Sequence, residues 1–284
     1  MAALVPEMVT GSRLDFAQQL WGTMYEAVLD ILGTTGTILA FGDPNHGKAD
    51  AATFTTVGSE QVVFTWSKAI GGWDTPLDLR KDSSYQGIIP ILEFDAVDQE
   101  ADTPDAAYWS RDDAGGANGF SVGAWVNVTD SAAFRIIFSK WDDTGSSELR
   151  EWDFLITSSD LLGFNLYDES MNVVSKRESD SAITQGEWRF FVGTYDGAGG
   201  TAASDTQILY DNGVVLASTA TNNANYAGME AQAVKPALGR VFGSGGFFNG
   251  LMAGGPIAPF FTQVELTADQ VLRLYEIGRR ALAL

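Results

Sequence analysis

Two acidic residues have a spacing that glycoside hydrolysis could use. Glu151 and Asp153 alternate along the chain with Trp152, Phe154 and Ile156. Alternate residues of a strand point to the same face, so the two carboxylates would share one face and the apolar residues the other. Hydrolysis of a glycosidic bond needs two carboxylates that flank it. A polysaccharide-cleaving enzyme is therefore one alternative. The interpretation that we favour is that the two acids lie on the solvated face of a strand whose other face, with Trp152, Phe154 and Ile156, packs in the core.

Other catalytic chemistry has little support in the residue types. The chain has no cysteine and a single histidine, His46. This excludes disulfides, a thiol nucleophile and any site with two imidazoles. His46 lies among Asp43, Pro44 and Gly47, which are typical of a turn. The glycine-rich stretches 197–200 and 243–246 do not join a strand to a helix, so we interpret them as loop tips and assign no catalytic residue.

Acidic residues in predicted loops point to calcium as the one candidate cofactor. Calcium binds hard oxygen ligands, which aspartates and backbone carbonyls at a loop rim can supply. Asp142, Asp143 and Asp211 are the acids that we place in such loops. The alternative interpretation is that they form a solvated rim.

Aromatic residues near loops are candidates for stacking on sugar rings. The C–H face of a sugar packs on an aromatic face, although most aromatic side chains of a β sandwich fill its core. The candidates are Trp73, Trp109, Trp141, Phe247 and Phe248.

Composition limits the class of protein and its partners. The 284 residues include 31 glycines, and acids outnumber bases by 37 to 17, which gives a net charge of −20. The glycine content and the many turn residues favour an all-β chain. An acidic surface repels phosphate backbones and anionic lipids, so we expect neither a nucleic-acid partner nor membrane insertion. Residues 1–10 lack the pattern of a secretory signal, so we expect synthesis in a cytoplasm.

The elements that position these residues begin with a helix. Apolar residues recur at three- and four-residue spacing over 14–32, which predicts an amphipathic helix that ends near Gly33. The apolar face packs either on the protein's own sheet or on a neighbouring subunit. The candidate assembly residues are Leu14, Leu20, Trp21, Met24 and Val28.

After this helix the sequence pattern divides into two regions. Residues 34–91 alternate short strand-like runs with turns, and we interpret 1–91 as a helix and arm for assembly or docking. From 92 to 284 short alternating strands follow one another at regular spacing, which is typical of an antiparallel sandwich. Asn212-Gly213 predicts a tight hairpin with a type I′ turn. Thr267 and Gln270 predict a capping box at the start of a final short helix.

Several motifs of region 92–284 together resemble laminin-G-like and pentraxin-like domains. The residues that carry this resemblance, in chain order, are Leu92–Asp98 (with Ala96 in place of the family's glycine), Phe120–Val128, Ile137–Lys140, Gly186–Gly197, Leu209–Gly213, Leu238–Arg240, Phe248–Leu251 and Leu266–Gly278. The resemblance implies a concanavalin-A-like jelly roll, a two-sheet antiparallel sandwich in which Trp125 faces the inter-sheet core. It also implies that calcium can bind at the rim. The Glu-x-Asp-x-x-Glu run of hydrolytic members of this fold is absent from the chain.

The fold class leaves function open, because this scaffold hosts lectins, adhesion modules and hydrolases. We predict a non-enzymatic structural or adhesion protein, a phage virion surface component such as a capsid decoration, head-fibre or tail protein. Its expected partners are further copies of itself, other virion proteins and a cell-surface glycan. The alternatives are a stand-alone glycan-binding module at an extracellular surface and a polysaccharide-cleaving enzyme.

Overall fold

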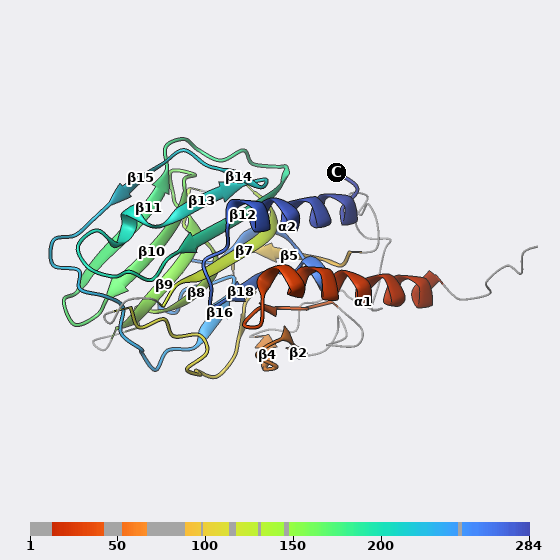
Figure 1. Cartoon of the computed structure of the whole chain (residues 1–284), viewed down its shortest axis with the longest axis horizontal. Helices are drawn as coiled ribbons and strands as arrows, with labels where there is room; N and C mark the ends of the chain where they lie inside the picture. The colour runs from red at the N-terminus through yellow and green to blue at the C-terminus, as the bar shows by residue number, and fades with distance from the viewer. Residues whose placement is uncertain are drawn as a thin grey trace, which may run out of the picture.

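The computed structural model describes residues 13–42, 53–66, 89–97, 99–113, 118–129, 132–144, 148–243 and 246–284, with backbone alone for 13–19. Two antiparallel sheets of nine strands each form a sandwich, as the sequence predicts (Figure 1). Sheet A contains β1 (Thr37–Ile38), β3 (Val57–Gly58), β5 (Ile91–Asp95), β7 (Phe120–Val128), β12 (Trp188–Tyr195), β13 (Ile208–Asp211), β14 (Val214–Val215), β17 (Asn249–Ala253) and β18 (Phe260–Thr262). Sheet B contains β2 (Thr53–Thr55), β4 (Val63–Trp66), β6 (Ala101–Asp102), β8 (Arg135–Asp142), β9 (Leu149–Ile156), β10 (Leu162–Asp168), β11 (Val173–Ser179), β15 (Ser218–Thr221) and β16 (Pro236–Leu238).

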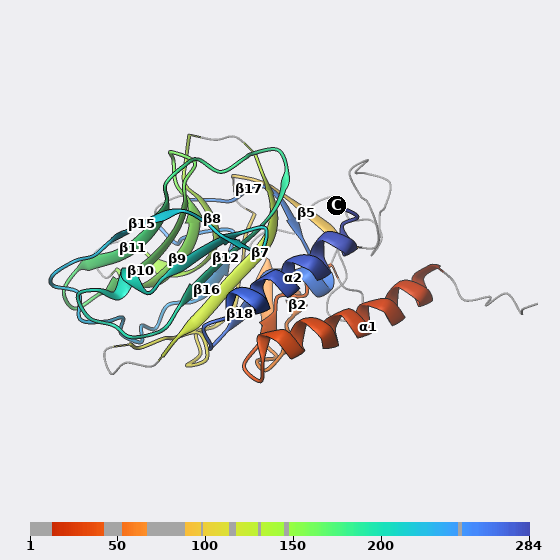
Figure 2. The ribbon, with the colours of Figure 1, turned by 45° about the horizontal axis from the view of Figure 1, so that its top comes forward.

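Helices are few and lie outside the sandwich. They are α1 (Arg13–Leu32), α2 (Ala268–Ala281) and the short 3-10 helices η1 (Ala203–Asp205) and η2 (Gly255–Ile257). The two α-helices lie beside each other at one end of the molecule (Figures 1 and 2). Among the described residues no helix is long and apolar enough to cross a membrane.

Aromatic side chains from both sheets fill the space between them. Phe120 of β7 contacts Trp152 of β9 at 5.6 Å and Phe261 of β18 at 5.5 Å between ring centroids. Trp152, Phe154 and Ile156 are all fully buried, which confirms the predicted core face of this strand. Contacts between aromatic rings add to the stability that burial provides.

Local turn and cap chemistry follows the sequence prediction closely. Asn212 and Gly213 have φ angles of 51° and 80°, and they join β13 to β14. These are the positive values that a type I′ turn requires. The capping box of α2 is present, with Thr267 accepting from the backbone N–H of Gln270. Gly33, with φ 78°, follows the end of α1.

Trp125 does not face the space between the sheets, which corrects the sequence prediction. Phe120 points inward, and residues of β7 alternate, so Trp125 points to the outer face of sheet A. There its indole stacks on Tyr275 of α2 at 5.5 Å and on Phe190 of β12 at 5.3 Å. Helix α2 therefore buries Trp125 on the outer face of sheet A, in place of the predicted burial between the sheets.

The described part of region 1–91 shares the sheets of the later region. Strand β1 pairs with β18 through Thr37 and Phe261, and β4 pairs with β6 through Trp66 and Ala101. Phe54 lies in the common core. The division into a docking region 1–91 and a domain 92–284 stays a prediction.

Candidate functional site

Four of the residues that the sequence singles out, Trp141, Asp142, Asp143 and Phe247, lie on the end of β8, a central strand of sheet B, and on the loop that packs against it. The loop after β16 folds back over the outer face of β8, where the N–H of Phe242 donates to the carbonyl of Trp141 at 3.2 Å. The N–H of Asp143 in turn donates to the carbonyl of Phe242 at 2.8 Å. Val241 of the loop packs on Ile136 and Leu155 in a small second hydrophobic cluster. We call this surface the β8 edge, defined by Trp141, Asp142, Asp143, Arg150, Tyr167, Arg240, Phe242 and Phe247.

Aromatic rings lie beside each of the two arginines of the β8 edge. Trp141 meets Tyr167 edge-on at 5.0 Å, and the Arg150 guanidinium lies 3.9 Å above the Tyr167 ring. Arg240 lies 4.7 Å from the Phe242 ring and 5.2 Å from the Phe247 ring. Trp141, Phe242 and Phe247 are each partly exposed. Aromatic faces beside fixed hydrogen-bond donors can hold a ligand that is apolar on one side and polar on the other.

Carboxylates hold the arginines of the β8 edge in place. Arg150 pairs with Glu169 at 3.1 Å and with Glu148 at 2.6 Å. Asp143 accepts from the indole N–H of Trp141 at 2.8 Å. Burial raises the pKa of Asp143, and the Trp141 hydrogen bond and nearby Arg150 oppose that rise. The ring and the two charged groups are therefore fixed before any ligand arrives, which lowers the entropy cost of binding.

A buried acid lies on the same outer face. Asp153 is opposite Ser139 of β8 and Asn165 of β10, and only 5% of its surface is exposed. Burial raises the pKa of Asp153 to about 8, and the Asn165 side chain opposes that rise. Its Oδ1 has no hydrogen-bond partner among the described residues. Asp153 is thus a largely protonated carboxyl group at neutral pH.

Glu151 is not part of a solvated surface, which corrects the interpretation that we favoured for the acid pair. Its side chain is fully buried and pairs with Lys140 at 2.5 Å. It also accepts from Ser110 and from the backbone N–H of Gln232. Burial raises the pKa of Glu151 to about 7, with Lys140 as the main opposing influence. Glu151 therefore links the segments that contain Ser110 and Gln232 to Lys140 of β8 inside the protein.

Two of the five candidate sugar-stacking residues cannot serve that role. Trp109 and Phe248 are fully buried in the main core, so neither offers a ring face to a ligand. Trp109 packs edge-on against Phe138 at 5.8 Å. The sequence could not separate them from Trp141 and Phe247, because loop and core aromatics have the same local pattern. Trp73 lies outside the described residues, as does His46.

The three candidate calcium ligands are not brought together. Asp142 and Asp143 lie at the end of β8 in sheet B, whereas Asp211 ends β13 in sheet A. Asp211 pairs with Arg189 at 3.3 Å. Across the part of the chain that the structure describes, no group of three metal-ligating side chains has the geometry to hold an ion. The set of three that we predicted is therefore wrong as one site.

The candidate assembly residues of α1 lie mostly inside their own chain. Trp21 and Val28 are buried in the main core, and Met24 packs against it, so the proposed interface role is wrong for the first two. Leu20 is 41% exposed, and the side chain of Leu14 lies outside the described residues. The apolar stripe of this helix packs on the sandwich, which is the other option that its pattern allowed.

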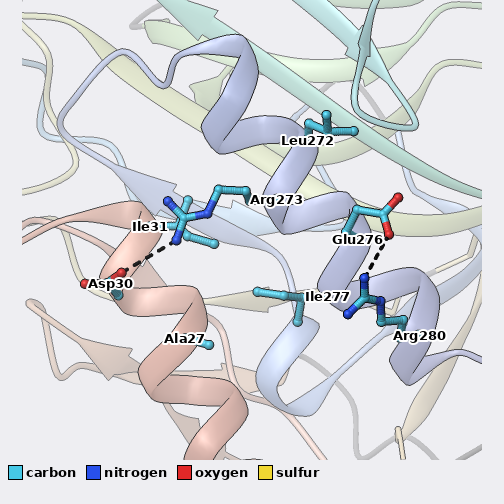
Figure 3. A pocket seen from close by; sticks show the side chains of 8 residues that line it. All are labelled: Ala27, Asp30, Ile31, Leu272, Arg273, Glu276, Ile277 and Arg280. Atoms are coloured by element: carbon cyan, nitrogen blue, oxygen red, sulfur yellow. Dashed lines mark hydrogen bonds and ion pairs between the residues drawn. The ribbon is translucent and has the colours of Figure 1, made fainter.

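A groove of about 430 Å³ remains between α1 and α2 (Figure 3). Its lining is mostly apolar, with Ala27 and Ile31 from α1 and Leu272 and Ile277 from α2. One ion pair joins the two helices at its rim, Arg273 of α2 with Asp30 of α1 at 3.7 Å, while Arg280 and Glu276 pair within α2 at 3.5 Å.

Sequence reasoning missed Tyr167, Arg150, Arg240 and Phe242 at the β8 edge. Each has an ordinary strand or loop context in the sequence. Tyr167 and Arg150 reach Trp141 through the pairing of β8, β9 and β10. Arg240 and Phe242 reach it through the loop after β16, which packs on β8 about 100 residues distant along the chain. The one local signal is the paired placement of Arg240 and Phe242 beside a glycine-rich loop tip.

A two-layer antiparallel sandwich is the architecture of jelly-roll domains, which include lectin domains. Residues 98–255 match the family model of the laminin G type that is described as the concanavalin A-like lectin/glucanases superfamily. This chain belongs to that superfamily.

Solved structures show the same fold at low sequence identity. The botulinum neurotoxin serotype D/C VPI 5993 binding domain is 12% identical, with a TM-score of 0.54, over 87% of this chain and 52% of that one. A Trypanosoma rangeli sialidase in complex with 2,3-difluorosialic acid is also 12% identical, with a TM-score of 0.53, over 95% of this chain and 39% of that one. This chain therefore spans about half of the toxin domain and two fifths of the sialidase. No curated protein matches it.

Proposed function

We propose that this protein is a non-catalytic recognition module that binds glycan at the β8 edge. The observation that carries this proposal is the gathering of partly exposed Trp141, Phe242 and Phe247 beside Arg150 and Arg240. Sugar rings present apolar C–H faces and hydroxyl rims, which suit aromatic faces with fixed donors between them. The superfamily includes lectins, and a toxin's binding domain has the same fold, which supports recognition.

The test is a glycan array on the intact chain and on Trp141→Ala. We expect the array signal to fall at least about tenfold, since aromatic stacking on this ring is lost. Val215→Ala is the control, because Val215 is 56% exposed on sheet A and remote from the β8 edge. Asp143→Ala is a second variant that leaves the hydrophobic cluster intact. Binding that persists in both β8-edge variants would contradict the proposal.

A hydrolytic function is the alternative that one observation favours. Glu151 and Asp153 have pKa values raised to about 7 and about 8, and such carboxyl groups can act as general acids at neutral pH. Against this, both side chains are nearly inaccessible. Turnover of any polysaccharide in a reducing-end assay, lost in Glu151→Gln, would establish the hydrolase in place of the binding module.

We further propose that the module is displayed on a phage virion and associates with copies of itself. Support comes from the acidic, cysteine-free composition and from the apolar groove between α1 and α2. Mass spectrometry of purified virions tests the location. Light scattering during size exclusion tests self-association, for which Leu272→Asp should return an oligomer to a monomer. A monomer at every concentration in the parent chain would contradict that part.

A further inference from the structure

A second pocket lies away from the β8 edge, between the C-terminal half of α2 and the outer face of sheet A. Its volume is about 470 Å³, within the usual range of small-ligand sites. Strands β7 and β12, the turn after β13 and helix α2 all contribute to it. The lining residues that matter are Trp125, Asn127, Glu187, Trp188, Asn212 and Tyr275.

Aromatic rings form the rigid part of this α2 pocket. The Trp125 indole is 1% exposed and is held between Phe190 and Tyr275, stacked within 28° and 15° of parallel. Trp188 is partly exposed and lies on the same face of sheet A, since Trp188 pairs with Asn127 where Phe190 pairs with Trp125. The pocket therefore has a fixed aromatic floor and a more accessible aromatic wall.

The amides of Asn127 and Asn212 and the carboxylate of Glu187 supply hydrogen-bonding groups at the α2 pocket. Asn212 accepts from the backbone N–H of Phe190 at 2.9 Å, which fixes its Oδ1 and leaves its amide N–H groups as donors. Asn127 stands directly opposite Trp188 on β7. The indole nitrogen of Trp125 is covered by Gly278 of α2, so it is not among the groups that the pocket offers to a ligand.

We propose that the α2 pocket binds a single neutral pyranose ring. An aromatic wall takes the C–H face of the sugar, and the amides of Asn127 and Asn212 bind its hydroxyl groups. This site is separate from the β8 edge and does not depend on binding there.

The charges at the α2 pocket select a neutral sugar over an acidic one. Glu187 is the one charged side chain among the described lining residues, and it is negative and exposed. The chain as a whole carries a net charge of −20. A sugar carboxylate would meet like charge with no cation in the lining, which costs affinity.

The test is fluorine NMR on the full chain labelled with 5-fluorotryptophan. The chain has eight tryptophans, and single Trp→Phe substitutions assign the Trp125, Trp141 and Trp188 signals. The probes are the methyl glycosides of glucose, galactose, mannose and N-acetylglucosamine, with glucuronic and sialic acids as charged comparisons. We expect at least one neutral glycoside to shift the Trp188 signal in a saturable manner, whether or not the Trp141 signal also moves.

Variants separate the pocket from a general loss of fold. Asn127→Ala should weaken the Trp188 titration about tenfold, since one direct hydrogen bond is lost. Asn225→Ala, an exposed amide outside the lining, should leave it unchanged. Thermal melting of both variants shows whether they fold.

Each outcome decides one of the two proposed sites. A Trp188 signal that no neutral glycoside moves, or that the acidic sugars move most, overturns the α2 pocket. Movement of Trp141 alone would leave the β8 edge and remove this second site. Movement of Trp188 alone supports the α2 pocket and counts against the β8 edge.

Discussion

At the scale of single residues, Ala96 holds a backbone conformation that suits glycine. Its φ angle is 63°, in the left-handed region, and its N–H donates to the carbonyl of Phe248 at 3.1 Å. The laminin-G-like motif that Leu92–Asp98 resembles has glycine at this position. A non-glycine residue there costs about 1–2 kcal/mol. The chain therefore stores strain at the turn that follows β5.

We predict that Ala96→Gly stabilises the protein by about 0.5–1 kcal/mol. The strain energy that the substitution removes from the folded state is larger than the entropic free energy by which glycine stabilises the unfolded chain. Urea unfolding monitored by tryptophan fluorescence measures the change. Ala27→Gly, in the middle of α1, should instead cost about 1 kcal/mol. Destabilisation by both variants would mean that Ala96 is not strained.

Asp153 makes the stability of the fold depend on pH. Burial raises its folded-state pKa to about 8, while the unfolded value is about 3.9. Between these pH values the folded state binds more protons than the unfolded state. The contribution of Asp153 to the free energy of unfolding therefore falls as pH rises from about 4 to about 8. Below that window the contribution is fully present, and above it the loss is complete.

We predict that Asp153→Asn flattens this dependence, because an amide cannot ionise. At pH 8 the variant should be more stable than the parent chain by at least about 1 kcal/mol. Near pH 4 the two should have similar stability, which is the internal control. Chemical unfolding at both pH values measures the difference, and parallel profiles would show that Asp153 is charged in the folded protein.

At the scale of elements, helix α2 packs closely on sheet A where Gly278 contacts Trp125. Gly278 lies over Trp125, and a Cβ built at Gly278 would be 1.9 Å from the indole nitrogen. No rotation of a stacked, buried indole can make that room without moving the helix. Glycine at this position is therefore what lets α2 cover Trp125.

We predict that Gly278→Ala destabilises the protein by about 1–3 kcal/mol and loosens α2, because it overpacks a filled contact. Gly22→Ala is the matched control, since a Cβ at Gly22 in α1 meets nothing within 4 Å. It should stabilise by about 0.5–1 kcal/mol through helix propensity. Thermal melting with circular dichroism measures both, and equal effects of the two variants would refute the packing argument.

At the scale of the whole molecule, charge opposes compactness. Thirty-seven acids against 17 bases leave a net charge of −20 on a single sandwich. Self-repulsion of this size destabilises the compact state, and salt screens it over about 10 Å at 0.1 M.

We predict that the melting temperature rises when sodium chloride is raised from about 10 mM to about 150 mM at pH 7. The gain should vanish near pH 4.2, the isoelectric point of the sequence, because little net charge remains to screen. Differential scanning calorimetry measures both. A salt effect of equal size at the two pH values would assign it to something other than net charge.

Local chemistry in the sequence was enough to predict the fold class. Alternation along β9, the Asn212-Gly213 turn and the Thr267–Gln270 cap all depend on neighbours within a few residues. Such features are decided by backbone geometry, so a sequence can reveal them. The superfamily motifs added the order of the strands.

The tertiary structure decided which face of each element is covered and by what. Trp125 is buried by α2 and Trp109 by the core, while Glu151 is buried beside Lys140. The alternation of a strand separates its two faces without saying which packs inward, and a loop that folds over a sheet edge buries residues that look exposed. The β8 edge and the α2 pocket arise from such long-range contacts, so neither is visible in the sequence.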